Sequence, residues 1–451
     1  MSQAGITLLI IAGLCVLYII DKLPVALVTT IGMLALVFSG GLTFSEAFSC
    51  FGSTPVVLTF GMVIIINAII ESGMITEFET ILLKMTRRGE KLFLVQILVT
   101  AGIISMFTNN TALVAMFMPF IASVAKASRG RIQKKHLYMP LAIGGLIGGT
   151  GTLAGSTAPL LASNVLEITG EEPFSFFTTA PVALIILAAV ALCYWFFLYD
   201  LQVKWFDFPE VDNDVAEERE EELFETKESL DLEGGLAIKE ALAGRTVMPV
   251  NKKHGIISIC VFLLCVVGFI TRPFEWDLGQ IACAGAVIVM LTGCVDTRKE
   301  LRNMMWPALI TLGAALAIAQ GFVVTGAGQV IIDWLIDTFG PSMTDPKVMV
   351  AVFLVAGWVI SNFMSNGSLV SMLAAVAVPM AIGAGVNPTP VAIACAIGAS
   401  MAFATPVATT TITMVQVAGY RFKDYFRIGG VVGAVGVTVA WLAIVSIYGL
   451  W

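Results

Sequence analysis

Two polar stretches decide the fold: Ser105-Met-Phe-Thr-Asn-Asn-Thr-Ala112 and Ser361-Asn-Phe-Met-Ser-Asn-Gly-Ser368. Each interrupts a long apolar run, 91–125 in the first case and 347–386 in the second. A single membrane crossing needs about 20 apolar residues, so both runs are too long for one helix. An overlong run with polar residues at its centre predicts a re-entrant helical hairpin with the polar stretch at its tip.

The apolar span after each hairpin is rich in Gly, Thr and Pro. The two spans, 137–162 and 389–415, contain Gly148-Gly-Thr-Gly-Thr-Leu-Ala-Gly-Ser-Thr-Ala-Pro159 and Ser400-Met-Ala-Phe-Ala-Thr-Pro-Val-Ala-Thr-Thr-Thr411. Non-helical backbone survives at membrane depth only where it is buried or lines a wet cavity. We therefore expect two broken helices. In each, the C-terminus before the break has free carbonyl groups and the N-terminus after the break has free N–H groups.

The composition excludes several classes of protein. Of the 451 residues, 58% are hydrophobic and 13% are charged, against roughly 45–50% and 25% in a soluble domain, which excludes a soluble enzyme. The net charge of -7 argues against a nucleic-acid partner. With only two histidines, a His-based metal centre or catalytic triad is not expected. The eight cysteines show no C-x-x-C spacing and are interpreted as small hydrophobic residues.

Eight plain apolar spans accompany the hairpins and the broken helices. They are 5–20, 23–40, 54–72, 179–199, 255–271, 278–294, 305–324 and 427–449. The sequence thus predicts an all-α polytopic membrane protein in which five transmembrane helices plus one hairpin occur twice. The predicted parts are a first repeat at 1–200, a linker at 201–254 and a second repeat at 255–451. Because five is odd, the second repeat is inverted, as in many secondary transporters.

The distribution of basic residues predicts the orientation, because cytoplasmic loops hold the excess of Lys and Arg. With both termini extracytoplasmic, 23 of the 25 basic residues fall on the inside of the plasma (inner) membrane. The first apolar run lacks the features of a cleaved signal peptide and is interpreted as a retained span. Residues 200–254 carry a net charge of -8. We expect 210–233 to be solvated and disordered, with a regulatory contact as the alternative, and 234–247 to form an amphipathic helix.

The polar residues suit particular ligands. Carbonyl groups with Asn and Ser oxygens suit Na+, whereas helix N–H groups with Thr and Ser hydroxyls suit a carboxylate or sulphate oxygen. Gly144, Gly148 and Gly155 have a plainer alternative as helix-packing residues, and threonines 409–411 can bond to carbonyls of their own helix. Asn110 and Asn366 are harder to explain structurally, because polar side chains at that depth mark ligand pathways.

At these residues the chain resembles the divalent anion/sodium symporters, the carboxylate and sulphate carriers of the ion transporter superfamily. The sharpest element is Ser400-Met-Ala-Phe-Ala-Thr-Pro-Val-Ala-Thr409, followed by Gly419-Tyr420. The hairpin tips, Asn109-Asn110-Thr111 and Ser365-Asn366-Gly367, match the family's Ser-Asn-Thr elements apart from single changes. The family's Thr-Pro-Pro-Asn element stands here as Ser156-Thr157-Ala158-Pro159 and Thr409-Thr410-Thr411-Ile412.

The resemblance implies two Na+ sites, one substrate site and a homodimer. The implied Na+ ligands are Ser105, Asn109, Asn110 and Gly155 in the first half, and Ser361, Ser365, Asn366 and Ala408 in the second. The implied substrate contacts are Asn110, Thr111, Ser156, Thr157, Asn366, Gly367, Thr409 and Thr410. The other expected partners are a small anion and membrane lipid.

The sequence therefore predicts a secondary active transporter that imports a di- or tricarboxylate with Na+ by alternating access. The nearest alternative is an anion exchanger or proton-coupled carrier of the same fold, with sulphate among its substrates. An anion channel is a weaker alternative, because opposed hairpins form occluded sites rather than a continuous pore. An enzyme is not expected, because no acid, base, nucleophile or metal set falls in the predicted core.

Overall fold

The computed structural model describes residues 2–20, 23–72, 89–128, 131–208, 252–271, 273, 276–302, 304, 306–327, 330, 345–363, 366–406 and 409–450. Within these ranges every regular element is a helix. The first-half helices are α1 Gln3–Ile20, α2 Val25–Phe38, α3 Phe44–Ser49, α4 Thr54–Glu71, α6 Glu90–Ser105, α7 Asn110–Ala127, α8 Lys134–Gly149, α9 Thr157–Ile168, α10 Ala180–Cys193 and α11 Tyr199–Trp205. The second-half helices are α14 Lys252–Thr271, α15 Leu278–Leu291, α16 Thr297–Arg302, α17 Trp306–Val324, α19 Pro346–Ser361, α20 Asn366–Gly383, α21 Pro388–Ser400, α22 Thr410–Met414 and α23 Phe422–Ile447. The predicted all-α class is confirmed.

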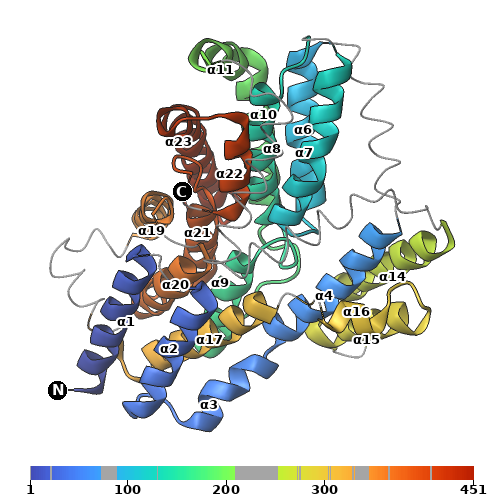
Figure 1. The fold of residues 1–451 in the computed structure, drawn as a ribbon. Coiled ribbons are helices and arrows are strands. Elements are labelled where there is room, and N and C mark those ends of the chain that lie inside the picture. The colour runs from blue at the N-terminus through green and yellow to red at the C-terminus, as the bar shows by residue number, and fades with distance from the viewer. Residues whose placement is uncertain are drawn as a thin grey trace.

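The helices fall into two groups (Figure 1). Helices α1–α4 and α14–α17, here called the frame helices, pack mainly on one another. Helices α6–α11 and α19–α23, here called the site helices, form the second group. The groups meet chiefly where α17 packs on α9 and α20. The polar stretches of the sequence all belong to the site helices.

Helices from the two halves of the chain interlock in both groups. Among the frame helices, α2 packs on α17 and α4 packs on α15. Among the site helices, α10 packs on α23, α9 packs on α20 and α21, and α22 packs on α7 and α8. The distal half of each broken helix therefore lies against the hairpin of the other half of the chain.

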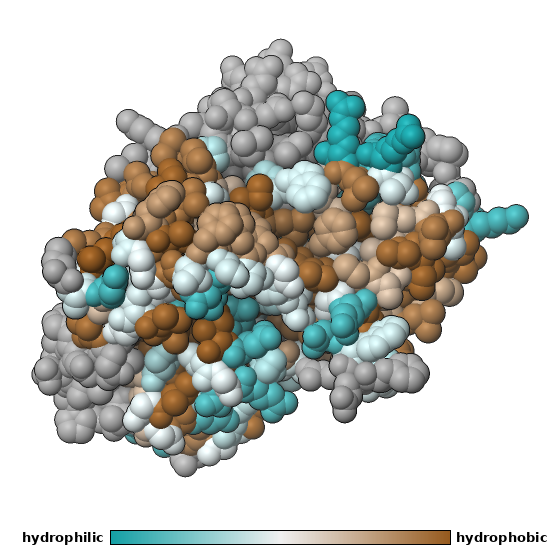
Figure 2. Space-filling model, turned by 90° about the horizontal axis from the view of Figure 1, so that it is seen from below, coloured by the Kyte–Doolittle hydropathy of each residue, from teal (hydrophilic) through white to brown (hydrophobic). Residues whose placement is uncertain are grey.

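The surface exposes many large apolar side chains. Phe38, Leu264, Leu291 and Phe196 are each at least two-thirds exposed, and apolar surface spreads over the face drawn in Figure 2. In the described ranges, five helices are long and apolar enough to cross a membrane, and seven shorter helices are also apolar. Exposed apolar surface on this scale is unusual for a soluble protein and suits contact with lipid. The chain is accordingly a multi-pass membrane protein.

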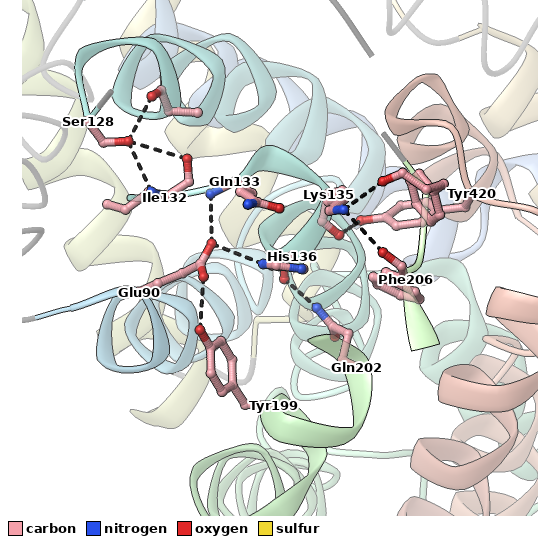
Figure 3. Close-up of polar contacts among 12 residues, drawn as sticks. Glu90, Ser128, Ile132, Gln133, Lys135, His136, Tyr199, Gln202, Phe206 and Tyr420 are labelled. Carbon is pink, nitrogen blue, oxygen red and sulfur yellow. Dashed lines mark hydrogen bonds and ion pairs between the residues drawn. The ribbon is translucent and has the colours of Figure 1, made fainter. Parts of the chain in front are cut away.

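A part-buried polar cluster joins the loop ends of three site helices (Figure 3). Glu90 Oε1 accepts a hydrogen bond from the Gln133 backbone N–H at 2.7 Å and lies 3.1 Å from His136 Nδ1. Glu90 Oε2 accepts from the Tyr199 hydroxyl at 2.9 Å. Gln202 Nε2 donates to the His136 carbonyl at 2.7 Å. This cluster joins α6 to α8 and α11 and so fixes the base of the first hairpin.

A buried carboxyl group lies on the short helix α16, between the apolar segments 278–294 and 305–324. Glu300 is 6% exposed, and its Oε1 accepts from Asn67 Nδ2 at 2.6 Å. Burial raises the pKa of this carboxyl, the Asn67 hydrogen bond lowers it, and the nearby Glu71 and Lys299 act in opposite directions. The net pKa lies above its ordinary value. The fold therefore favours the neutral form of Glu300.

Glu300→Gln should stabilise the protein at pH 8 and leave its stability unchanged near pH 4. A raised pKa means that the stability contributed by the neutral carboxyl is full below the ordinary pKa and is lost as the pH rises through the raised value. Glutamine keeps the neutral hydrogen-bonded form at every pH. We expect a gain in Tm of about 1–2 °C at pH 8 in detergent, because a given free energy shifts Tm less in a chain of 451 residues than in a smaller one. A variant less stable than the wild type at pH 8 would show that Glu300 is buried as a stabilised anion.

Candidate substrate and cation site

The first hairpin tip is held by its own polar side chains. Helix α6 ends at Ser105 and α7 begins at Asn110. Ser105 Oγ donates to Asn110 Oδ1 at 2.7 Å. Asn109 Oδ1 accepts from the backbone N–H groups of Thr111 at 2.9 Å and Ala112 at 3.3 Å. The Asn109 oxygen thus caps α7, as Asn does at many helix starts.

Three backbone carbonyl oxygens converge on Gly155 in the first broken helix. A Cβ atom built on Gly155 would lie 2.6 Å from the Gly149 oxygen, 2.7 Å from the Ser105 oxygen and 2.9 Å from the Met106 oxygen. We call this group the carbonyl cradle. It joins the C-terminal ends of α6 and α8, where the helix dipoles place partial negative charge. Carbonyl oxygens at two negative helix ends favour a cation.

The side chain of Asn110 lies beside the cradle. A Cβ atom built on Gly149 would overlap the Asn110 amide group, so only glycine at 149 leaves room for it. The Thr152 hydroxyl donates to the Met106 carbonyl and accepts from the Ala154 N–H at 3.2 Å. Thr152 is fully buried. Its hydroxyl therefore fastens the break in the helix to the hairpin tip.

The second half has a similar arrangement with one difference. Thr405 Oγ1 donates to the Asn362 carbonyl at 2.5 Å, which fastens the second break to the second hairpin. The Asn362 side chain adds two more bonds, donating to the Trp358 carbonyl at 2.7 Å and accepting from the Ala404 N–H at 2.9 Å. Ser361 Oγ donates to the Trp358 carbonyl at 3.0 Å. Unlike Ser105, Ser361 therefore bonds to its own helix.

Residues of opposite halves approach one another closely at two places. Thr111 Oγ1, on the first hairpin, lies 3.1 Å from Thr411 Oγ1 on α22. A Cβ atom built on Gly367, on the second hairpin, would lie 3.3 Å from Thr157 Oγ1 on α9. Thr157 follows Gly155 by two residues, so its Cα atom lies within roughly 8 Å of the Gly155 Cα atom. The structure thus brings both hairpin tips and both broken helices into one region.

Several polar atoms in this region are buried without a hydrogen-bond partner. They are Ser156 Oγ, Asn366 Oδ1 and Ser368 Oγ. An unsatisfied buried polar atom costs about 1–3 kcal/mol, and such atoms in a native protein mark places where a ligand or water completes the bonding. No charged side chain occurs in the polar stretches of either half. Any ion here would be held by neutral oxygens, N–H groups and helix dipoles.

The remaining predicted site residues have the following places. Thr409 caps α22 by accepting from the Ile412 N–H at 3.3 Å, and Thr410 is the first residue of that helix. Ser365 and Ala408 lie outside the described residues, as do the loop segments 210–233 and 234–247. Gly144 and Gly148 face the α6 backbone at Leu98 and Gly102, which agrees with a packing role for both.

Some residues of the region were not identified from the sequence. They are the carbonyl groups of Met106 and Gly149 and the side chains of Thr152, Asn362, Thr405 and Thr411. Every residue has a backbone carbonyl group, so the residue types cannot show which carbonyl groups contribute to a site. The buried threonines lie in the polar stretches quoted from the sequence, and this position was the only feature of the sequence that could have indicated a role in the site.

The fold and this region define a class of multi-pass membrane protein with two hairpins and two broken helices around a polar centre. A model of the citrate transporter family matches residues 15–398, and the chain belongs to that family. The resemblance to carboxylate carriers is thereby confirmed.

Individual proteins similar to this chain are also named as transporters, and their alignments cover different shares of the two sequences. The uncharacterized transporter YfbS of Escherichia coli is 32% identical over 40% of this chain and 29% of YfbS. The uncharacterized transporter sll0640 of Synechocystis is 28% identical over 41% of this chain and 30% of its own length. The matched region thus spans less than a third of these two relatives. The sodium-dependent dicarboxylate transporter SdcS of Staphylococcus aureus is 23% identical over 87% of this chain and 76% of SdcS.

A solved structure shares the fold. The YdaH transporter of Alcanivorax borkumensis superimposes with a TM-score of 0.55 over 91% of this chain and 88% of YdaH. The two sequences are 15% identical, so this likeness concerns the fold alone.

Proposed function

We propose that the chain is a sodium-coupled symporter that imports a small multivalent anion, a di- or tricarboxylate, by alternating access. The observation that carries the proposal is the meeting of hairpin tips and broken helices from opposite halves, through Thr111 with Thr411 and Gly367 with Thr157. Membership in the citrate transporter family and the likeness to SdcS support the same chemistry.

The anion would be held by helix N-termini and neutral donors. Helices α7, α9 and α20 begin at Asn110, Thr157 and Asn366, and a helix N-terminus carries about half a positive charge. Hydroxyl and amide groups beside these ends suit carboxylate oxygens. The unpartnered Ser156 Oγ is free to join them. A dicarboxylate could place one carboxylate group against the donors of the first half and the other against the donors of the second half.

The first Na+ would bind at the carbonyl cradle, with Asn110 beside it. In the second half the unpartnered Asn366 Oδ1 supplies a corresponding amide oxygen. Na+ at these places would offset part of the substrate charge in a region without basic side chains. Binding of Na+ and substrate should then be reciprocal, each raising the affinity for the other.

Alternating access would follow from an inverted repeat. Helices α6 and α19 both contain 16 residues, and α7 and α20 both contain 18. By their order in each half, α2 corresponds to α15 and α4 corresponds to α17. The packing of α2 on α17 therefore has a counterpart in the packing of α15 on α4. We propose that the site helices move as one unit past the frame helices in an elevator-like step. The proposed assembly is a homodimer with both termini extracytoplasmic and the acidic loop inside.

The second candidate is a proton-coupled carrier or an anion exchanger of the same fold, including one that carries sulphate. Proton coupling needs a group that titrates near the substrate, and the described parts of the polar stretches contain no carboxyl or imidazole group. This observation favours Na+ as the coupling ion.

A thermal-shift screen of the purified protein tests the proposal. Succinate, citrate, sulphate and aspartate are each added with Na+ or with choline as the only cation. We expect at least one di- or tricarboxylate to raise Tm in Na+ and to have little effect in choline, because a bound ligand stabilises the folded state. Stabilisation by carboxylate that is equal in choline would favour the proton-coupled or exchange alternative. Stabilisation by sulphate alone would overturn the carboxylate assignment.

A further inference from the structure

Thr411 is placed to control the orientation of the Thr111 hydroxyl. Its Oγ1 lies 3.1 Å from Thr111 Oγ1, and either oxygen can be the donor. Thr411 is 3% exposed and belongs to α22, whereas Thr111 belongs to the first hairpin. The pair is therefore a part-buried hydroxyl–hydroxyl contact between the two halves of the chain. Thr411 stands at a proline position of the Thr-Pro-Pro-Asn element quoted above, where no hydroxyl is expected.

The backbone around both hydroxyls is fixed by other bonds. Asn109 Oδ1 holds the Thr111 N–H. On α22, the single O–H group of Thr413 lies 2.5 Å from the Pro406 carbonyl oxygen and 3.0 Å from the Thr409 carbonyl oxygen, and these two acceptors share it. Thr413 thus bonds back to its own chain segment, as threonine commonly does in helices, whereas Thr411 meets the opposite half. With the backbone held in this way, what remains open is which of the two hydroxyl groups, Thr111 or Thr411, donates its proton to the other.

Each hydroxyl has one proton and can accept further bonds. When Thr111 accepts from Thr411, its own proton is free for another acceptor. When Thr111 donates to Thr411 instead, Thr111 has no proton left to donate to a substrate oxygen. A carboxylate oxygen near the α7 N-terminus selects the first arrangement, because it needs a donor. Accepting a hydrogen bond also polarises the Thr111 O–H group and makes it a stronger donor.

We propose that Thr411 is a positioning residue for the substrate that acts through Thr111. It donates to Thr111 Oγ1 and thereby directs the Thr111 O–H group at a carboxylate oxygen. This inference rests on the proposed function and adds a residue from the opposite half to the substrate site. It also requires the first hairpin and α22 to stay together while substrate is bound.

Uptake kinetics in proteoliposomes test the inference with the carboxylate that the thermal-shift screen identifies. Thr411→Val keeps the side-chain shape and removes the hydroxyl, and we expect the substrate KM to rise about fivefold to tenfold, the value of one hydrogen bond between uncharged groups. Thr411→Ser restores the donor and should bring KM within about twofold of the wild type. Thr30→Val is the matched control, because Thr30 bonds to the Ala26 carbonyl of its own helix α2 among the frame helices.

A double-mutant cycle separates positioning from simple packing. If Thr411 acts through Thr111, the pair Thr111→Val and Thr411→Val should raise KM no further than Thr111→Val alone. A KM for Thr411→Val within about twofold of the wild type, or multiplying effects in the double variant, would overturn the inference. Thr411→Ala carries the same expectation should Thr411→Val fail to give folded protein. Absence of carboxylate transport by the wild-type protein would instead overturn the proposed function together with this inference.

Discussion

Replacing Asn110 or Asn366 with alanine is expected to abolish sodium-dependent uptake while the protein still reaches the membrane. The Asn110 amide is bonded to Ser105 and fits against Gly149 beside the carbonyl cradle. The Asn366 oxygen is buried and unpartnered. Loss of two bonds to ionic ligands, each worth about 1.5–3 kcal/mol, reduces transport at low substrate concentration by roughly a hundredfold or more.

Initial rates in proteoliposomes under a Na+ gradient measure this effect. Asn387→Ala is the matched control, because Asn387 caps α21 by accepting from the Thr389 N–H at 3.0 Å and lies in the loop before that helix. The control should lose some thermal stability and keep its transport kinetics. Unchanged kinetics in both Asn110→Ala and Asn366→Ala would remove the basis for the proposed site.

Gly155→Ala is expected to weaken Na+ binding, so that substrate binding requires a much higher Na+ concentration. The added methyl group would occupy the space between the carbonyl oxygens of Ser105, Met106 and Gly149, each within 3.0 Å of the new carbon. Real Cβ atoms do not approach backbone oxygens so closely, so either the oxygens move apart or the cation is excluded. Overpacking of this kind costs about 1–3 kcal/mol, and we expect the Na+ concentration for half-saturation to rise at least about tenfold.

A Na+ titration of the thermal shift, with substrate at fixed concentration, measures this change. Gly430→Ala in α23 is the matched control, because its new methyl group would meet no atom within 4 Å. Both variants should elute from gel filtration as single peaks. A Gly155→Ala protein that folds and responds to Na+ like the wild type would show that the carbonyl cradle is not the cation site.

The sequence predicted the helical pieces of the site well because their ends are marked by residue type. Polar residues in the middle of an apolar run placed the tips between Ser105 and Asn110 and between Ser361 and Asn366, where the helices do end and begin. The Gly-rich stretch likewise placed the break between Gly149 and Thr157. In each case, a residue type that does not suit a continuous membrane helix coincides with its interruption.

The contacts of the site were less predictable because they depend on long-range packing. No spacing in the sequence pairs Thr111 with Thr411, or Thr157 with Gly367, which lie in opposite halves of the chain. The carbonyl cradle is formed by main-chain atoms whose direction depends on where two helices end. The resemblance implies Asn109 as a Na+ ligand, and this role stays a prediction; the structure adds that the Asn109 oxygen accepts from N–H groups at the start of α7.

Carboxylate uptake driven by an imposed Na+ gradient tests the central claim most directly. Purified protein is reconstituted into liposomes, and labelled succinate or citrate is supplied outside with Na+ or with choline at the same external pH. The account predicts accumulation above equilibrium only with the inward Na+ gradient, and prompt loss of accumulated substrate when a Na+ ionophore dissipates it. Equal accumulation in choline driven by a pH gradient, or no carboxylate uptake in either cation, would contradict it.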